Sequence, residues 1–415
     1  MSSNLKIFLF FSLISLNIFS QVEEVNPPNF IKTITFRSNT NEGELPVLQK
    51  GERLNLEFDV LNGDEADYYY VIEHYNFDWT PSILMKQEYI EGFDNIRVRD
   101  YENSFNTFQI YSHYQLQIPN TQTRLKVTGN YLLKILDRDG ELMFSRKFMV
   151  YEDLTSVGVN VKRSRDVRFI KQKQAVNFEV SSLGITLTNP KQTVKTVIIQ
   201  NNNLRNVIND LKPQFVTGNN LIYRYDYEAS FWGGNEFLNF ENKDIRGATN
   251  AIKYIDLQDL YHNFLYEDVV RYHQPYTFNP DINGNFLITA LDGDNPSLEA
   301  DYAVIHFSLL ENELPQGEEI YIYGNFNNYD ISENTQMIYN PDNRKYEAEL
   351  LLKQGFYNYK YVIVDSEGYI DEGAVSGNFD VTENNYKVLI YYRDLGELYD
   401  RIIGFGEANS VNITN

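Results

Sequence analysis

Cysteine is absent from this chain of 415 residues. Its absence excludes disulfide bonds, thiol catalysis and metal sites built on thiolates, so packing alone must hold the fold together. It also excludes the lipid-bearing cysteine that anchors a bacterial lipoprotein. After the first 20 residues there is no apolar run of the roughly 18 residues that a spanning helix needs. The sequence therefore predicts a protein that no helix or lipid anchors in a membrane.

Basic residues are scarce relative to acidic ones. The 36 Lys and Arg residues face 58 Asp and Glu residues, which gives a formal net charge of -22. A chain this acidic lacks the basic patch that non-specific nucleic-acid binding needs, so we expect no nucleic-acid partner and no direct insertion into lipid. The charge serves solubility. The alternative is that it complements a basic patch on a partner protein.

The first 20 residues have the layout of a cleaved secretory signal peptide. One positive charge, Lys6, precedes an apolar stretch, and a charged, proline-containing sequence begins at Gln21. The apolar stretch has about 13 residues, whereas a bilayer span takes roughly 20. We therefore expect the mature protein to start near Gln21 in an exported compartment.

Tyrosine and phenylalanine are abundant, with 32 and 27 copies, whereas tryptophan occurs only twice. This composition favours β-sheet. Short alternating runs separated by turn residues, such as residues 31–36, 54–60 and 303–309, are typical of β-sandwiches. The fold class is therefore predicted as all-β, with tandem immunoglobulin-like or fibronectin-like β-sandwich domains after the signal peptide.

Composition and turn signals divide the chain into successive sections. The predicted parts are a signal peptide (1–20), an N-terminal β-sandwich (21–152), a central β-sandwich (153–310), a C-terminal early-set immunoglobulin-like domain (311–393) and a loose tail (394–415).

Catalytic and metal-binding signatures are missing. The sequence has no Gly-x-Ser-x-Gly elbow, Ser-x-x-Lys motif, phosphate loop or dinucleotide fingerprint, which argues against an enzyme. His262 and His273 lack the spacing of a zinc site, and the Asp-rich segments 281–285 and 292–295 lack the glutamate that completes a calcium loop. These segments are interpreted as turns, and no cofactor or metal is expected.

Two sections resemble known sandwich domains. Residues 70–79, an aromatic strand that ends in Asp78-Trp79, resemble fibronectin-like domains. Residues 319–329 and 355–364 resemble the early-set immunoglobulin-like domains that include glycogen-binding modules. That resemblance implies an alternative function, an exported carbohydrate-binding protein. The sugar-stacking rings would be Tyr323, Phe326 and Tyr329, the last at a position usually held by tryptophan.

The most specific pattern lies mid-chain. Residues 231–240 read Phe-Trp-Gly-Gly-Asn-Glu-Phe-Leu-Asn-Phe, and a Glu-Ala-Asp-Tyr strand begins at Glu299. This order resembles the type IX secretion system plug protein family, long known as a domain of unknown function. Leu238 and Glu241 depart from the Arg and Asp expected there.

The family resemblance implies a non-enzymatic periplasmic protein. It would bind the periplasmic opening of a large outer-membrane β-barrel translocon and seal its pore when no substrate is in transit. The motif would be either part of the barrel-facing surface or a structural turn whose glycines permit positive φ, and we favour the turn. The candidate motif residues are Phe231, Trp232, Gly233, Gly234, Asn235, Glu236, Phe237 and Phe240.

Overall fold

β-Strands dominate the computed structural model, which describes residues 21–38, 45–61, 63, 65–411 and 413. The helices within these residues are single turns: α1 (Lys86–Tyr89), α2 (Pro190–Thr193), α3 (Pro296–Glu299) and the 3₁₀ segment η1 (Asn325–Asn327). The all-β prediction is therefore confirmed. None of these helices is long and apolar enough to cross a bilayer. The predicted signal peptide, residues 1–20, lies outside the described residues.

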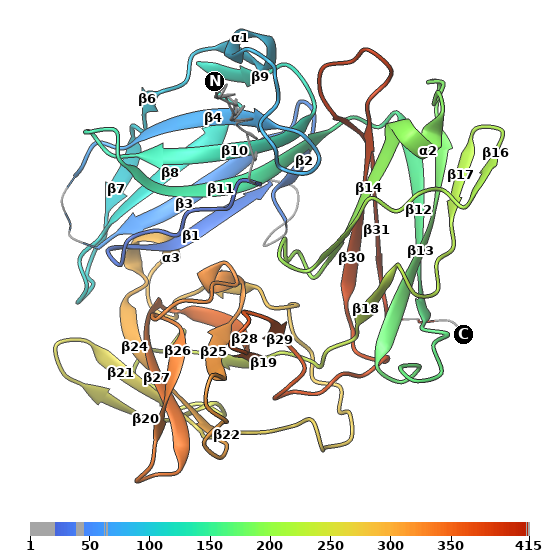
Figure 1. The fold of residues 1–415 in the computed structure, drawn as a ribbon. Coiled ribbons are helices and arrows are strands. Elements are labelled where there is room, and N and C mark those ends of the chain that lie inside the picture. Colours follow the sequence, from blue (N-terminus) through green and yellow to red (C-terminus); the bar gives the residue numbers. More distant parts are fainter. Residues whose placement is uncertain (1–20, 39–44, 62, 64, 412, 414–415) are drawn as a thin grey trace, which may run out of the picture.

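The first domain is a sandwich of two sheets, blue to cyan in Figure 1. One sheet has the order β1 (Ile31–Ser38), β3 (Leu54–Val60), β8 (Ser112–Ile118), β7 (Asp100–Asn103). The other is built on β11 (Leu142–Tyr151), β10 (Gly129–Leu136), β4 (Tyr69–Tyr75) and β6 (Ile96–Arg97), with β2 (Val47–Gln49) beside β11. A small ribbon pairs β5 (Ile90–Gly92) with β9 (Thr123–Leu125). Alternation turns Leu54, Leu56 and Phe58 into the core, where Phe58 stacks on Tyr114 at 5.1 Å between ring centroids.

The second domain is also a sandwich. One sheet contains β12 (Thr155–Arg163), β13 (Lys173–Ser182), β17 (Asn220–Tyr223), β16 (Phe215–Thr217) and β18 (Ser230–Trp232). The facing sheet contains β15 (Val207–Asn209), β14 (Val194–Gln200), β30 (Asn385–Tyr392) and β31 (Arg401–Asn409). A bridge between Tyr151 and Ile402 joins this sheet to β11, so one sheet runs through both domains.

Strand β31 lies inside the segment that the sequence predicts as a loose tail (394–415), and here the structure differs. β31 pairs with β30 from Asn385↔Asn409 to Tyr392↔Arg401. Two glycines weaken the strand pattern of this segment in the sequence, but the packing of the strand requires them. A Cβ on Gly404 would lie 2.1 Å from Oγ1 of Thr155, and one on Gly406 would lie 2.5 Å from the carbonyl oxygen of Val157.

The third domain is one strongly bent sheet whose two arms enclose a common core. Its order is β19 (Leu238–Glu241), β28 (Gly355–Val364), β25 (Glu319–Tyr323), β26 (Gln336–Asn340), β27 (Lys345–Lys353), β24 (Tyr302–Leu310), β21 (Tyr261–Leu265), β20 (Ile252–Leu257). Three short strands flank it: β22 (Asp268–Val269), β23 (Phe286–Ile288) and β29 (Ile370–Asp371).

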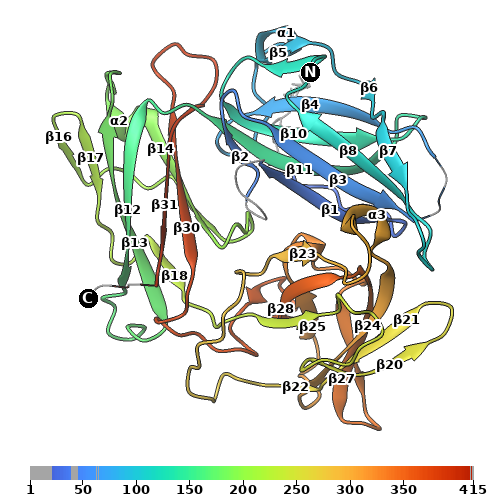
Figure 2. The ribbon, with the colours of Figure 1, turned by 180° about the vertical axis from the view of Figure 1, so that it is seen from behind.

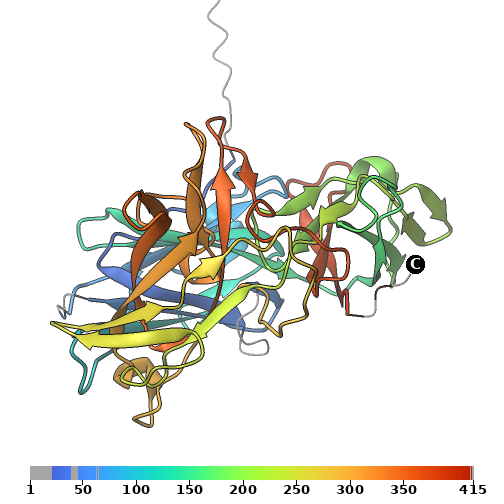
Figure 3. The same ribbon diagram turned by 90° about the horizontal axis from the view of Figure 1, so that it is seen from below.

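The third domain is inserted into the second. The chain leaves the second domain after β18, forms β19 to β29, and returns to it with β30. The domain boundary expected at residue 310 therefore does not separate two sheets. β24, which precedes residue 310, pairs with β27, which follows it, over eight residue pairs. Figure 1 and the view from behind in Figure 2 show the three domains around a common centre, and Figure 3 shows the second domain set to one side of the other two.

Candidate functional site at the domain junctions

The mid-chain motif forms the crossing from the second domain into the third, and it lies against the returning chain. The amide of Phe379 donates to the carbonyl oxygen of Gly234 at 2.8 Å. A Cβ on Gly233 would lie 2.0 Å from the carbonyl oxygen of Phe379, so only glycine allows this approach. Gly234 has φ of +65°. The two glycines therefore allow the outgoing and returning segments to lie directly against each other.

Buried amide side chains fasten the same crossing. Nδ2 of Asn384 donates to the carbonyl oxygen of Gly233 at 2.8 Å and to Oε1 of Gln174 at 3.1 Å. Nε2 of Gln174 donates to the carbonyl oxygens of Asp380 and Thr382, both at 2.8 Å. Asn384 and Gln174 are 3% and 0% exposed. Because an unmade buried hydrogen bond is costly, this network fixes the geometry of the crossing.

Glu236 is the acidic residue of the motif, and its surroundings strongly perturb its pKa. It is 1% exposed, its Oε1 accepts hydrogen bonds from the hydroxyl of Tyr276 and the amide of Glu383, and its Oε2 has no partner. Burial raises the pKa of Glu236 to about 7, and the nearby Asp281 carboxyl adds to the rise. Burial also raises the pKa of Asp281. Nη2 of Arg271 donates to the main-chain oxygen of Glu236 at 2.8 Å and to Oγ of Ser376 at 3.1 Å. The two carboxyls partly offset the lowering of the Arg271 pKa by burial, but among the described residues the guanidinium donates no hydrogen bond to either of them.

The other motif side chains are buried or bonded to neighbouring segments, except that of Trp232. Phe231, Phe237 and Phe240 are buried, and Phe240 stacks on Tyr357 at 5.1 Å. Nδ2 of Asn235 donates to the carbonyl oxygen of Ser376 at 2.7 Å. Trp232 is 40% exposed. Of the predicted motif residues, it alone presents a large part of its side chain to solvent.

Trp232 lies on the surface of the second domain. Its ring meets the edge of Phe169 at 5.1 Å, and Nζ of Lys173 lies 4.2 Å from its centroid. Ring and ammonium attract each other in this geometry, which fixes the indole against the domain. The exposed face of Trp232 is the part of the motif that a partner can reach.

The candidate sugar-stacking rings do not form an open platform. Tyr323 and Tyr329 are 1% and 4% exposed, and Phe326 is half-buried. The hydroxyl of Tyr323 accepts a hydrogen bond from Nδ2 of Asn203 at 3.0 Å, and that of Tyr329 donates to the carbonyl oxygen of Asn201 at 3.3 Å. These tyrosines connect the third domain to the second, so their faces are not free to receive a sugar ring.

A buried charged network connects the first domain to the third. Nζ of Lys353 lies 2.7 Å from Oδ2 of Asp59, and the two side chains are 1% and 0% exposed. The hydroxyl of Tyr302 donates to the same oxygen at 2.7 Å, and Nδ1 of His113 lies 2.7 Å from Oδ1. The hydroxyls of Tyr302 and Thr33 are 2.6 Å apart. The sequence analysis missed this network, because its bonded partners lie up to 294 positions apart and no motif marks them.

Two of the three histidines of the third domain, His262 and His306, form a pair, whereas His273 lies against the ring of Tyr272. Nδ1 of His262 lies 2.8 Å from Nε2 of His306, and Nδ1 of His306 lies 3.1 Å from a carboxylate oxygen of Glu349. Within the described part of the chain there is no group of three or more His, Cys, Asp or Glu residues placed to hold a metal ion.

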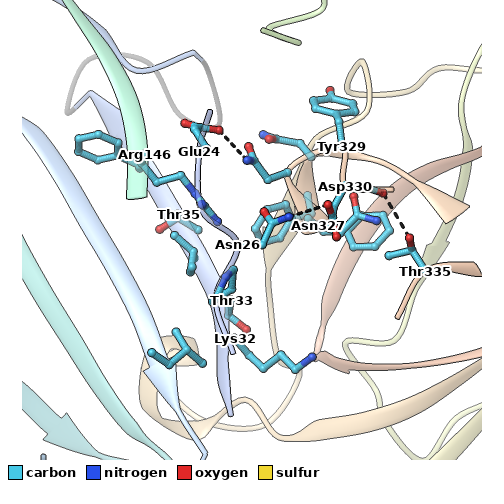
Figure 4. A pocket seen from close by; sticks show the side chains of 18 of the residues that line it. Glu24, Asn26, Lys32, Thr33, Thr35, Arg146, Asn327, Tyr329, Asp330 and Thr335 are labelled. Atoms are coloured by element: carbon cyan, nitrogen blue, oxygen red, sulfur yellow. Dashed lines mark hydrogen bonds between the residues drawn. The ribbon is translucent and has the colours of Figure 1, made fainter. Parts of the chain in front are cut away.

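A cavity of about 220 Å³ opens where the three domains meet (Figure 4). Its walls come from the N-terminal segment with β1, from β11, from the loop after β14, and from the loops and β27 of the third domain. Nδ2 of Asn26 donates to Asp330 at 2.5 Å, and the hydroxyl of Thr335 donates to the carbonyl oxygen of Asp330 at 3.2 Å, which closes one side. The cavity includes Phe326 and Tyr329 from the predicted sugar site.

Comparison with known proteins places this architecture. Residues 31–152 match the family described as type 9 secretion system plug protein, 1st domain. The crystal structure of a hypothetical protein from Parabacteroides merdae matches with a TM-score of 0.90 and 30% identity, over 94% of this chain and all of that chain. A trypsin-activated alpha-2-macroglobulin from Escherichia coli aligns at 8% identity, over 93% of this chain and 29% of that one, with a TM-score of 0.17. No curated protein matches the sequence. From the match to the first domain, together with the order of motifs along the chain, this protein belongs to the type 9 secretion system plug protein family.

Proposed function

We propose that this protein binds the periplasmic opening of the large outer-membrane β-barrel translocon of the type IX secretion system, and seals its pore when no substrate is in transit. The observation that carries the proposal is the match of the whole first domain, residues 31–152, to the plug protein family. The predicted signal peptide supports a periplasmic location.

The way in which the domains are joined supports a plug. The first and third domains share the buried Lys353–Asp59 pair, and the second and third share the amide network around Asn384. A sheet continues from the second domain into the first through Tyr151 and Ile402. A body that closes a wide pore has to resist deformation, and buried polar networks and shared sheets fix relative domain positions better than a flexible linker does.

A binding role also fits the chemistry of the buried polar groups. Glu236, Asp59 and Lys353 engage main-chain or side-chain partners that join domains. We infer that the protein acts by binding rather than by catalysis, in accord with its family.

Capture from the native envelope tests the proposal. A chromosomally tagged copy is purified from solubilised envelopes, its partners are identified by mass spectrometry, and the cells are fractionated. We expect one very large outer-membrane barrel as the main partner, with the tagged protein in the periplasm. Recovery without any barrel, or with the tagged protein outside the cell, refutes the proposal and directs attention to a glycan array.

Pore conductance then tests the sealing step. The barrel is reconstituted in a planar bilayer, and the purified protein is added to one side. We expect the open current to fall when the protein is added to one side of the bilayer, and to stay unchanged when it is added to the other side. The Trp232→Ala variant asks whether the exposed indole takes part, and Tyr369→Ala, which removes a ring that is 62% exposed in the third domain, is its control. An open current that persists at saturating protein contradicts sealing.

A further inference from the structure

The cavity between the three domains carries a surplus of positive charge, in contrast to the net charge of -22 of the chain. Two carboxylates, Glu24 and Asp330, contribute to its lining. Its cationic side chains are Lys32, Arg37, Arg146, Lys147 and Arg205. Because the Debye length is about 8 Å at physiological ionic strength, the groups that line the cavity decide its potential, and the distant acidic surface is screened.

The cations of the cavity make no close ion pairs with residues that the structure describes. Among the described residues, none of the five makes an ion pair within 4.0 Å. Nη1 of Arg146 donates to the carbonyl oxygen of Ser145 at 2.8 Å, and Nζ of Lys147 lies 4.6 Å from the ring centroid of Trp79. The side chains of these two cations therefore contact neutral groups.

The carboxylates of the cavity have other partners. Oε2 of Glu24 accepts a hydrogen bond from Nδ2 of Asn328 at 2.7 Å, and Oε1 accepts from the amide of Lys147. Oδ1 of Asp330 accepts from Asn26 (Figure 4). They hold the N-terminal segment to the loop of the third domain, so the positive surplus remains available to a ligand.

Several of the cationic side chains that line the cavity are partly buried. Burial lowers the pKa of Lys32, and no carboxylate offsets that shift. Burial also lowers the pKa of Arg146, which Glu24 and Asp330 offset only in part, and the pKa of Lys147, which Glu24 and Glu23 offset only in part. A partly desolvated cation without a counter-charge is unfavourable, and an anionic ligand would relieve that cost.

Two strand edges border the cavity. β1 ends its sheet, and every residue from 31 to 37 lines the cavity. On the other side, β26 pairs with β27 only up to Glu347, whereas the lining residues of β27 are 350–352. Successive residues of a strand point to opposite faces, so a consecutive run along a cavity means that the strand presents its edge. An edge offers unpaired main-chain groups to an added strand.

We propose that this cavity binds an extended, carboxylate-rich peptide segment of a partner protein. The main chain of the segment adds to the edge of β1, and its acidic side chains pair with the cations, Lys32 and Arg205 among them. The strand edge and the cations have different roles in binding. Main-chain hydrogen bonds to the strand edge give affinity, and the positive charge selects an acidic sequence. The proposal is independent of the translocon, because it concerns a site within the isolated protein.

Binding of synthetic peptides to the purified mature protein tests the proposal. The probe is a fluorescein-labelled peptide of alternating Glu and Val, and the comparison probe alternates Lys and Val. By fluorescence anisotropy, we expect the Glu-Val peptide to bind at least ~10-fold more tightly than the Lys-Val peptide, and more weakly at about 0.5 M salt. No binding of the Glu-Val peptide at about 1 mM overturns the proposal.

A second probe isolates the main-chain contribution without altering the protein. Methylation of alternate amide nitrogens of the Glu-Val peptide, in each of the two registers, removes the donors that a β-ladder needs while keeping the charge. We expect at least one register to lose ~10-fold or more in affinity. Equal affinity of all three peptides overturns strand addition, and displacement of the peptide by inorganic phosphate alone at equal concentration overturns a peptide site in favour of a small-anion site.

Variants locate the site. Lys32→Gln combined with Arg205→Gln is expected to weaken the Glu-Val peptide by ~10-fold or more, whereas Lys191→Gln, at an exposed lysine on α2 in the second domain, leaves it unchanged. Equal effects of both variants place the binding elsewhere and overturn the assignment. If circular dichroism shows a lower melting temperature for the double variant than for the unaltered protein, the binding of the methylated peptides to the unaltered protein is the deciding test.

Discussion

Replacing Lys353 by Met tests whether the buried pair holds the first and third domains together. The change keeps most of the side-chain volume but leaves Asp59 charged, 0% exposed, and dependent on Tyr302 and His113. Loss of one partner of a buried ion pair costs about 3–5 kcal/mol. The remaining donors reduce the loss. The carbonyl oxygen of Ser297 loses its hydrogen bond from Nζ at 2.8 Å but keeps the one from the hydroxyl of Tyr111 at 3.2 Å, so it adds little. We therefore expect a loss of about 4 kcal/mol in the free energy of unfolding.

Urea unfolding followed by fluorescence measures this loss in separate parts of the protein. The two tryptophans report on different domains, Trp79 on the first and Trp232 on the second, and Trp→Phe variants separate their signals. A second measurement combines Lys353→Met with Asp59→Asn. Because that pair of changes leaves no uncompensated charge, we expect it to recover about half of the loss or more.

An exposed ion pair provides the control. Nζ of Lys243 lies 3.1 Å from Glu241, and both side chains are well exposed. Lys243→Met is expected to cost less than about 1 kcal/mol. The reasoning is refuted if Lys353→Met costs no more than Lys243→Met, or if the effects of the two buried substitutions simply add.

Three further outcomes follow from the junctions. Stability is expected to fall as pH rises from about 4.5 to about 7, by up to about 3 kcal/mol, because the raised pKa of Glu236 makes the folded state bind a proton that the unfolded state has lost. Thermal melting across this pH range measures the slope, and Glu236→Gln should make it shallower, although Asp281, whose pKa burial also raises, keeps part of it; an unchanged slope in the variant contradicts the assignment. Gly233→Ala is expected to cost at least about 2 kcal/mol, because its Cβ would meet the carbonyl oxygen of Phe379, whereas Gly158→Ala, with open space around it, should be neutral in the same urea assay. Soluble glucans are expected to leave the melting temperature unchanged, since Tyr323 and Tyr329 are buried, and a clear rise would restore the carbohydrate-binding alternative.

Local pattern was enough to predict the strands but not their partners. Alternation at residues 54–60 and 303–309 predicts β3 and β24. The division at residue 310 fails to follow the sheets because β24 finds its partner β27 across a further 35 or more residues, and nothing in a local period specifies a partner at that distance.

The candidate site was predictable to the extent that glycine reports backbone geometry. From the sequence alone, Gly233 and Gly234 suggested a turn with positive φ, and Gly234 has φ of +65°. The close approach of the segment around Phe379 to Gly233 was not predicted and comes from the structure. The tyrosines at 323 and 329 could not be placed in advance, because a resemblance to a sugar-binding fold says nothing about a second domain that covers the rings. The charged pair between Asp59 and Lys353 left no sequence signal, since each residue alone resembles an ordinary polar position of an alternating strand.

The insertion of the third domain makes completion of the second domain depend on the end of the chain. β14 receives β30 along seven residue pairs, from Val194↔Tyr392 to Gln200↔Tyr386, but β30 is synthesised only after every strand of the third domain. The edge of β14 that receives β30 therefore stays unpaired until that strand is made, whereas the other edge can already pair with β15. Any truncation or proteolytic cut that removes β30 and β31 therefore damages the second domain as well as the chain beyond the cut, and leaves an incomplete molecule open to further proteolysis.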